Sequence, residues 1–169
     1  MAEKGNLRIR ALRSSDVATI CQLSEDLGLS RWSDSDLIEE LERAESLMLL
    51  AELDQQTVGF IVGRQVPGTD EGRFDAEIYN IGVAARFHKK GIGSKLLERF
   101  LEWAQVNRVV NVWLEVRAAN LSARSFYKRN GFEEIITRKR FYNAPVDDAI
   151  IMKAEVSGYY NVLNKESLK

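Results

Sequence analysis

The chain of 169 residues is long enough for one domain and short for two. Its 24 basic and 25 acidic side chains nearly cancel, which argues against a protein that mainly coats nucleic acid or an anionic membrane. The single cysteine excludes an internal disulfide framework. With only one histidine in addition, the chain has too few ligands for a typical structural zinc site.

The chain also shows no pattern typical of secretion or membrane insertion. Its first six residues include no apolar run of the kind found in signal peptides. The longest fully apolar run, residues 47–51, is far too short to span a bilayer. We therefore expect a soluble, cytoplasmic protein with no direct contact to membrane or nucleic acid.

The first half of the chain predicts two helices and several strands. Residues 7–12 alternate as a strand does, and an apolar stripe over residues 17–27 indicates a helix. Cys21 lies on that stripe, where a small buried hydrophobe is the alternative to a nucleophile. Ser33-Asp34-Ser35-Asp36 is typical of a cap, which predicts a second helix after it. Strands follow at 47–53 and 57–64, as a hairpin, and at 77–83.

The second half predicts alternating helices and strands. We expect a helix over 94–106, a strand over 111–116, a helix over 121–129 and closing strands over 132–140 and 148–154. Strand–helix–strand–helix–strand order indicates locally parallel strands, whereas the first half indicates antiparallel ones. The predicted fold class is therefore α/β, with a mixed central sheet and flanking helices. We expect one domain over residues 1–154 and a tail over residues 155–169.

A glycine-containing loop lies between the strand at 77–83 and the helix at 94–106. Gly91-Ile92-Gly93 lets the backbone approach a ligand closely, and the first amides of a helix have no intrahelical partner. The helix dipole and the charges of Lys89-Lys90 both favour an anion such as phosphate. The alternative is that the glycines only permit close packing.

Spacing excludes two common phosphate loops. A P-loop requires glycine at the position of His88 and lysine at that of Ser94. A dinucleotide fingerprint requires a third glycine where Leu96 stands. The loop therefore belongs to neither class.

The same loop resembles that of a known family. His88-Lys89-Lys90-Gly91-Ile92-Gly93 is similar to the acetyl-CoA pyrophosphate loop of the GNAT superfamily of N-acetyltransferases, Gln/Arg-x-x-Gly-x-Gly/Ala, with histidine at the first position. The segment from Trp113 to Asn120, then Phe126-Tyr127 and Asn130-Gly131-Phe132, resembles the branch that acetylates ribosomal-protein alanine. The resemblance runs from about residue 7 to about residue 152. It implies the single-domain GNAT fold, in which a splayed parallel strand pair holds the cofactor.

The resemblance also implies a co-substrate, an acceptor and roles for individual residues. The co-substrate is acetyl-CoA, without a metal, and the acceptor is a protein N-terminal α-amine, best represented by the terminal alanine of a ribosomal protein. Glu115 is the implied general base, acting through water, and Tyr127 the implied general acid. Trp32 and Tyr142 are implied to line the acceptor groove. The implied cofactor contacts are Ile81, Gly82, Val83, His88, Lys89, Lys90, Gly91, Ile92, Gly93, Ser94 and Asn120.

The chemistry of acetyl transfer is compatible with these residue types. An α-amine has a pKa of about 8, so roughly a tenth of it is neutral at pH 7, whereas a lysine amine costs about 3 kcal/mol more to deprotonate. A modest base such as Glu115 therefore suffices for an α-amine. On a strand it faces away from its neighbours Leu114 and Val116. The Tyr127 phenol, with a usual pKa near 10, is close enough to a thiol near 8.5 to donate a proton to the leaving sulfur.

Each assignment has a structural alternative. Glu115 is otherwise a surface carboxylate paired with Arg117, and Tyr127 a half-buried aromatic. Trp32 and Tyr142 otherwise tie loops to the core. The functional alternatives are an acetyltransferase for lysine or small amines and a non-catalytic acyl-CoA-binding module.

Overall fold

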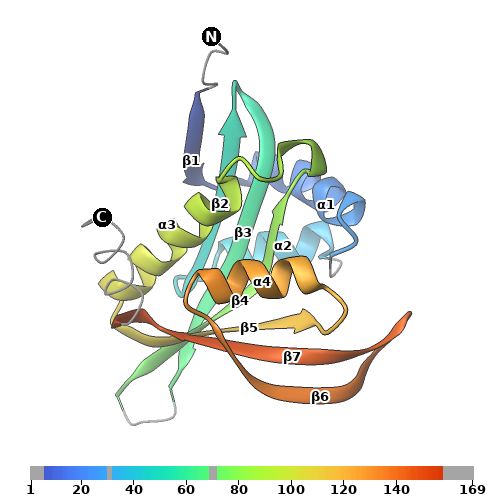
Figure 1. The fold of residues 1–169 in the computed structure, drawn as a ribbon. Helices are drawn as coiled ribbons and strands as arrows, with labels where there is room; N and C mark the ends of the chain where they lie inside the picture. The colour runs from blue at the N-terminus through green and yellow to red at the C-terminus, as the bar shows by residue number, and fades with distance from the viewer. Residues whose placement is uncertain (1–5, 30–31, 69–71, 158–169) are drawn as a thin grey trace, which may run out of the picture. The chain divides into compact units, whose positions relative to one another are not determined.

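The computed structural model describes residues 6–29, 32–68 and 72–157. Within them lie one seven-stranded mixed sheet, four α-helices and two short 3-10 helices (Figure 1). The strands are β1 (Leu7–Ala11), β2 (Ser46–Leu53), β3 (Gln56–Pro67), β4 (Phe74–Val83), β5 (Val109–Arg117), β6 (Glu133–Asn143) and β7 (Val146–Glu155). The helices are η1 (Ser14–Asp16), α1 (Val17–Asp26), α2 (Asp34–Leu41), η2 (Ala85–Phe87), α3 (Ile92–Val106) and α4 (Leu121–Arg129).

The order of hydrogen-bonded strands is β1-β2-β3-β4-β5-β7-β6. The pairs β1–β2, β2–β3, β5–β7 and β6–β7 are antiparallel. The pair β4–β5 is parallel, with its register ending where Ile78 lies opposite Leu114. The predicted α/β class with a mixed sheet is confirmed.

Both predicted steps connect strands that run in the same direction, but only the first connects strands that pair with each other, because β7 lies between β5 and β6. The connection β4–α3–β5 joins parallel strands as expected. After α4, however, β6 pairs with β7 and not with β5, and the pairing is antiparallel. Only Ala144 and Pro145 separate β6 from β7, and so short a connection permits only a hairpin. Figure 1 shows this hairpin as two long adjacent ribbons coloured orange to red.

The chain forms two compact units. The first unit comprises residues 1–64 and 79–102, and the second comprises residues 65–78 and 103–169. The predicted tail over 155–169 falls almost entirely outside the described residues.

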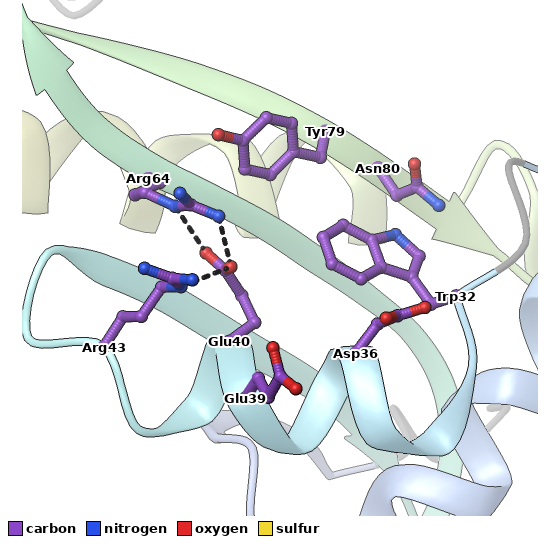
Figure 2. Close-up of a pocket in the computed structure, with 8 residues that line it drawn as sticks. All are labelled: Trp32, Asp36, Glu39, Glu40, Arg43, Arg64, Tyr79 and Asn80. Carbon is purple, nitrogen blue, oxygen red and sulfur yellow. Dashed lines mark hydrogen bonds and ion pairs between the residues drawn. The ribbon is translucent and has the colours of Figure 1, made fainter.

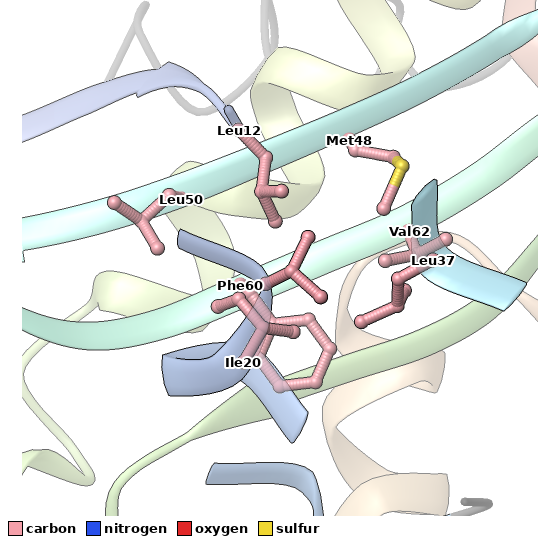
Figure 3. Packing of buried hydrophobic residues seen from close by; sticks show 8 residues of the cluster. Leu12, Ile20, Leu37, Met48, Leu50, Phe60 and Val62 are labelled. Carbon is pink, nitrogen blue, oxygen red and sulfur yellow. The ribbon is translucent and has the colours of Figure 1, made fainter. Parts of the chain in front are cut away.

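The first unit is built on an apolar core between its helices and its antiparallel strands (Figure 3). Alternate residues of a strand share one face, so Met48 and Leu50 of β2 point to the same side, as do Phe60 and Val62 of β3. Helix α2 begins at the predicted capping box, in which the Ser33 hydroxyl accepts from the Asp36 amide at 3.1 Å. The remaining buried members of the core are Leu12, Val17, Ile20 and Leu37.

The second unit contains a buried carboxylate that cross-links its parallel strands. Asp75 of β4 is 5% exposed and accepts from the Trp113 indole at 2.8 Å and from the side-chain and backbone amides of Asn111 at 3.0 and 3.2 Å. A buried carboxylate of this kind is tolerated because its oxygens are satisfied. The polar side chains thus hold the start of β5 against β4.

Candidate functional site

In the first unit, the loop after β4 leads directly into α3. Gly91 has φ +80°, a left-handed conformation that glycine adopts without a steric penalty. The first backbone hydrogen bond of α3 runs from the Lys95 amide to the Gly91 carbonyl at 3.0 Å. The amides of Ile92, Gly93 and Ser94 precede that bond and have no intrahelical acceptor. Such a helix start attracts anions.

His88 braces the loop from within. Its Nε2 lies 2.6 Å from the Val83 carbonyl oxygen, so the ring donates a hydrogen bond to the end of β4. Lys89 and Lys90 are exposed, and the Lys90 ammonium lies 5.2 Å from the Phe87 ring centroid. The two lysines of the loop are therefore open to solvent, whereas the His88 side chain is hydrogen-bonded to the backbone of β4.

The end of β4 is packed closely on the other side. A Cβ atom at Gly82 would lie 2.7 Å from Leu27 Cδ1 and 3.0 Å from Leu29 Cδ1, closer than real contacts allow. A Cβ at Gly91 would meet nothing within 4 Å. A side chain at Gly82 would therefore displace the ends of the Leu27 and Leu29 side chains, whereas open space adjoins the loop at Gly91.

In the second unit, Glu115 and Tyr142 are brought together. The Tyr142 hydroxyl donates to Glu115 Oε1 at 2.9 Å, and Arg138 Nη1 lies 3.6 Å from Glu115 Oε2. The Arg117 guanidinium lies 3.9 Å from the Tyr142 ring centroid and donates to the Pro145 carbonyl at 3.1 Å. The alternative predicted that Glu115 pairs with Arg117. This is wrong, because Glu115 pairs with Tyr142 and Arg138. Burial, and then the hydrogen bond to Glu115, raise the pKa of Tyr142 to about 12.

Tyr127 lies on α4 with its ring enclosed. It is 7% exposed, and its ring packs at 5.3 Å from Phe126 and 5.7 Å from Phe132, centroid to centroid. Burial raises the pKa of Tyr127 above its usual range. The phenol is therefore protonated at neutral pH, and it is a weaker acid than an exposed tyrosine.

Asn120 is the N-cap of α4. Its Oδ1 accepts from the Ala123 amide at 3.1 Å, which stabilises the helix start. The amide nitrogen of the Asn120 side chain is the group that remains for a ligand.

Trp32 packs in the first unit and also lines a cavity. Its ring lies 5.9 Å from that of Tyr79, and both border a cavity of about 470 Å³ (Figure 2). Both interpretations of Trp32, as a brace and as a lining residue, are therefore compatible with its position. Residues 30 and 31, which precede Trp32, lie outside the described residues.

The cavity contains a charged residue that the sequence interpretation missed. Glu40 is 2% exposed and is bound by Arg64, whose Nε lies 2.9 Å from Glu40 Oε1. A signal was present, because Glu40 stands three residues after the buried Leu37 and so shares the core face of α2.

Cys21 is held in a setting that favours packing. Its Sγ donates to the Trp32 carbonyl at 3.5 Å. Burial and then the neighbouring Asp34 raise the pKa of the thiol to about 11. It is therefore a thiol and not a thiolate at neutral pH.

Residues 17–132 match the model of the acetyltransferase (GNAT) family. The chain belongs to this family. It is 32% identical over 152 residues to the [ribosomal protein bS18]-alanine N-acetyltransferase of Salmonella typhimurium, covering 88% of this chain and 97% of that one. It is 29% identical over 164 residues to an N-alpha-acetyltransferase of Sulfurisphaera tokodaii, covering 90% and 96%. A solved structure of Arabidopsis thaliana Naa50 in complex with the bisubstrate analogue CoA-Ac-MVNAL superimposes with a TM-score of 0.77 at 25% identity, covering 87% and 97%.

Family membership confirms the resemblance that the loop and the downstream motifs carried. The GNAT fold and the acyltransferase class of enzyme are both as expected. None of the helices in the described part of the chain is long and apolar enough to cross a membrane. The described residues also contain no group of three or more His, Cys, Asp or Glu side chains placed to hold a metal ion.

The loop of this GNAT chain combines several features that favour an anion. Free amides at the start of α3, the adjacent lysines and the open space beside Gly91 are what a doubly charged anion requires.

Proposed function

We propose that this protein transfers an acetyl group from acetyl-CoA to the α-amino group of a protein N-terminus. The loop at the start of α3 is the observation that carries the coenzyme part of the proposal. The first candidate acceptor is the terminal alanine of a ribosomal protein, because the Salmonella typhimurium relative is named for that reaction.

The proposal also covers the cellular compartment of the protein and the boundaries of its domain. A reducing compartment such as the cytoplasm agrees with a single cysteine kept as a thiol. The acetyltransferase domain is proposed to span residues 1–154, which contains the family match at 17–132, and residues 155–169 form a tail.

The first unit supplies the proposed coenzyme contacts. The amides from Lys89 to Ser94 bind the diphosphate, with Lys89 and Lys90 adding charge. His88 is removed from the predicted set, because its backbone amide donates to the Ala85 carbonyl at 3.1 Å and its ring to the Val83 carbonyl. The backbone of Ile81, Gly82 and Val83 binds the amides of the pantetheine arm. For Asn120, in the second unit, the proposed role is a coenzyme contact through its side-chain amide.

Two residues of the second unit move protons in the proposed reaction. Glu115 accepts, through water, the proton that the α-ammonium group must lose before its nitrogen can attack. The new C–N bond forms at the acetyl carbonyl as the C–S bond breaks, and the Tyr127 hydroxyl protonates the departing sulfur. Trp32 and Tyr142 are proposed to contact the acceptor peptide.

A peptide set tests the acceptor class. Each peptide contains one internal lysine, and its α-amine is either free or blocked, so that mass spectrometry after incubation with acetyl-CoA locates the acetyl group. We expect acetylation at the free α-amine and none on the blocked peptides. Acetylation confined to the internal lysine would replace this proposal by the lysine alternative.

Thiol release tests the catalytic part. If wild-type protein binds CoA but releases no thiol with any amine, and Tyr127→Phe behaves identically, the protein is the non-catalytic acyl-CoA-binding module.

A further inference from the structure

The cavity beside Trp32 has an uneven distribution of charge. Three carboxylates and two guanidinium groups line it, so its formal charge is −1. The carboxylates are Asp36, Glu39 and Glu40, all from α2, and the guanidinium groups are Arg43 and Arg64.

Both arginines are directed to one carboxylate. Arg64 Nε lies 2.9 Å from Glu40 Oε1, its Nη2 contacts Glu40 Oε2, and Arg43 Nε lies 3.5 Å from the same oxygen. Figure 2 shows the two guanidinium groups converging on Glu40 at one end of the cavity. Arg64 also lies 5.5 Å from the Tyr79 ring centroid. The positive charge of the cavity is thus gathered around a buried anion.

The opposite end combines negative charge with an aromatic face. Glu39 makes no hydrogen bond or ion pair with any residue that the structure describes. Asp36 uses one oxygen to accept from the Ser33 amide at 3.0 Å. Figure 2 draws the Asp36 carboxylate and the Trp32 indole at this same end of the cavity. A cation placed at this end would lie near two carboxylates and an aromatic ring, and both kinds of group favour a cation.

The cavity lies along the strand that is proposed to bind the acetyl carrier. Tyr79 and Asn80 border the cavity, and Ile81–Val83 follow them directly on β4. A strand advances about 3.3 Å per residue, so the cavity lies about 10 Å along β4 from Gly82. An extended peptide covers that distance in about three residues.

We propose that this cavity binds a cationic side chain at position 2, 3 or 4 of the acceptor peptide. The proposal rests on the proposed function, because it assumes that the peptide's α-amine is directed to the coenzyme. It makes this protein an enzyme for N-termini that carry an early arginine or lysine, with Glu39 as the residue that sets the preference.

The test compares arginine with citrulline, which has the same shape and no charge. Alanine-initiated peptides carry one or the other at position 2, 3 or 4, which avoids a second acetylatable amine. We expect kcat/KM to be about fivefold to tenfold higher for arginine at the best position, as an exposed ion pair plus a cation–π contact give. The difference should arise mainly in KM and should shrink in high salt.

Glu39→Gln is the variant, and Glu42→Gln, on an exposed residue outside the cavity, is the matched control. Asp36 is left intact because it belongs to the capping box of α2. We expect Glu39→Gln to abolish the preference for arginine and Glu42→Gln to keep it. Equal kcat/KM for arginine and citrulline peptides in the wild type, or a full preference in Glu39→Gln, would overturn the inference.

Calorimetric binding of the same peptides separates this inference from the proposed function. If arginine peptides bind more tightly than citrulline peptides but none is acetylated, the cavity holds the cation and the proposed reaction is wrong. If all peptides are acetylated equally and bind equally, the reaction stands and the subsite does not.

Discussion

Glu115 is held from two directions by side chains of β6. The Tyr142 hydroxyl donates to one carboxylate oxygen, and Arg138 faces the other. Since the pKa of Tyr142 is raised to about 12, the phenol remains a donor throughout the physiological range. The carboxylate is therefore oriented before any substrate arrives, which is a favourable starting state for a base that acts through water.

Removing that hydroxyl tests whether the orientation matters. Tyr142→Phe keeps the ring under Arg117 and removes only the donor to Glu115. We expect kcat/KM for N-terminal acetylation to fall about tenfold, the effect of losing one hydrogen bond to a charged group. Steady-state kinetics measure it, with Val146→Ala, at a residue 60% exposed, as the control. Unchanged kinetics would mean that Tyr142 does not support Glu115.

Tyr127 gives a sharper prediction, because its ring is buried and its hydroxyl is the proposed proton donor. Tyr127→Phe preserves the packing with Phe126 and Phe132, so the melting temperature should stay close to that of the wild type. We expect kcat to fall about a hundredfold or more, as for loss of a general acid. A thiol-release assay measures the rate and circular dichroism the melting temperature. Wild-type rates in this variant would assign the proton donation to another group.

The orientation of a side chain on its strand could be predicted from the sequence, but its interaction partner could not. The exposed position of Glu115 between two buried neighbours followed from strand alternation and is confirmed. Its partner did not follow, because Tyr142 is brought from 27 residues away by the pairing of β6 with β7 and β7 with β5. Glu40 and Arg64 likewise meet across 24 residues. Such pairs depend on tertiary register, which local periodicity does not contain.

Among the elements, the loop before α3 combines an unusual backbone conformation with a proposed contact to charge. Aspartate and asparagine both tolerate a positive φ better than most residues, so either can replace Gly91. The two differ only in charge.

We therefore expect Gly91→Asp to bind CoA about tenfold more weakly than Gly91→Asn, because a carboxylate would face the diphosphate. Isothermal calorimetry with CoA measures both affinities. Since the two side chains have the same size, Gly91→Asn controls for strain and bulk. Equal CoA affinities of the two variants would mean that this loop does not bind the diphosphate.

The elements themselves were predicted well where caps and periodicity act locally. The helix over 121–129 and the capped start of α2 are confirmed. Strands β3 and β4 were predicted too short, because the polar residues near 67–72 were interpreted as loop. The Gly68 amide donates to the Arg73 carbonyl at 2.9 Å, and this hydrogen bond joins the two strands beyond their apolar residues.

At the scale of the whole molecule, several carboxylates are stabilised by basic partners. The Arg10 guanidinium, between Asp16 at 2.7 Å and Glu52 at 2.7 Å, lowers the pKa of both acids. Arg124 lowers the pKa of Glu134, and Lys139 lowers that of Asp148. Each of these carboxylates has a lower pKa in the folded protein than in the unfolded chain.

The folded state is therefore stabilised fully above the unfolded-chain pKa of about 4, and loses that contribution as the pH falls through the folded-state values. We expect the free energy of unfolding to be nearly constant from pH 8 to 6 and to decline below about pH 4.5. Urea unfolding at a series of pH values measures it. In Arg10→Gln the difference from the wild type should narrow at low pH; a difference that stays the same down to pH 3 would contradict this account.

The position of Trp32 allows peptide binding to be followed by intrinsic tryptophan fluorescence. Of the three tryptophans, Trp32 borders the cavity that Glu39 and Glu40 also line. The Trp113 indole instead donates a hydrogen bond to the buried Asp75 carboxylate. A guanidinium group seated against the Trp32 face should quench or shift its fluorescence. Titration with an arginine peptide should therefore give a saturable emission change that Trp32→Phe removes, without any label on protein or peptide.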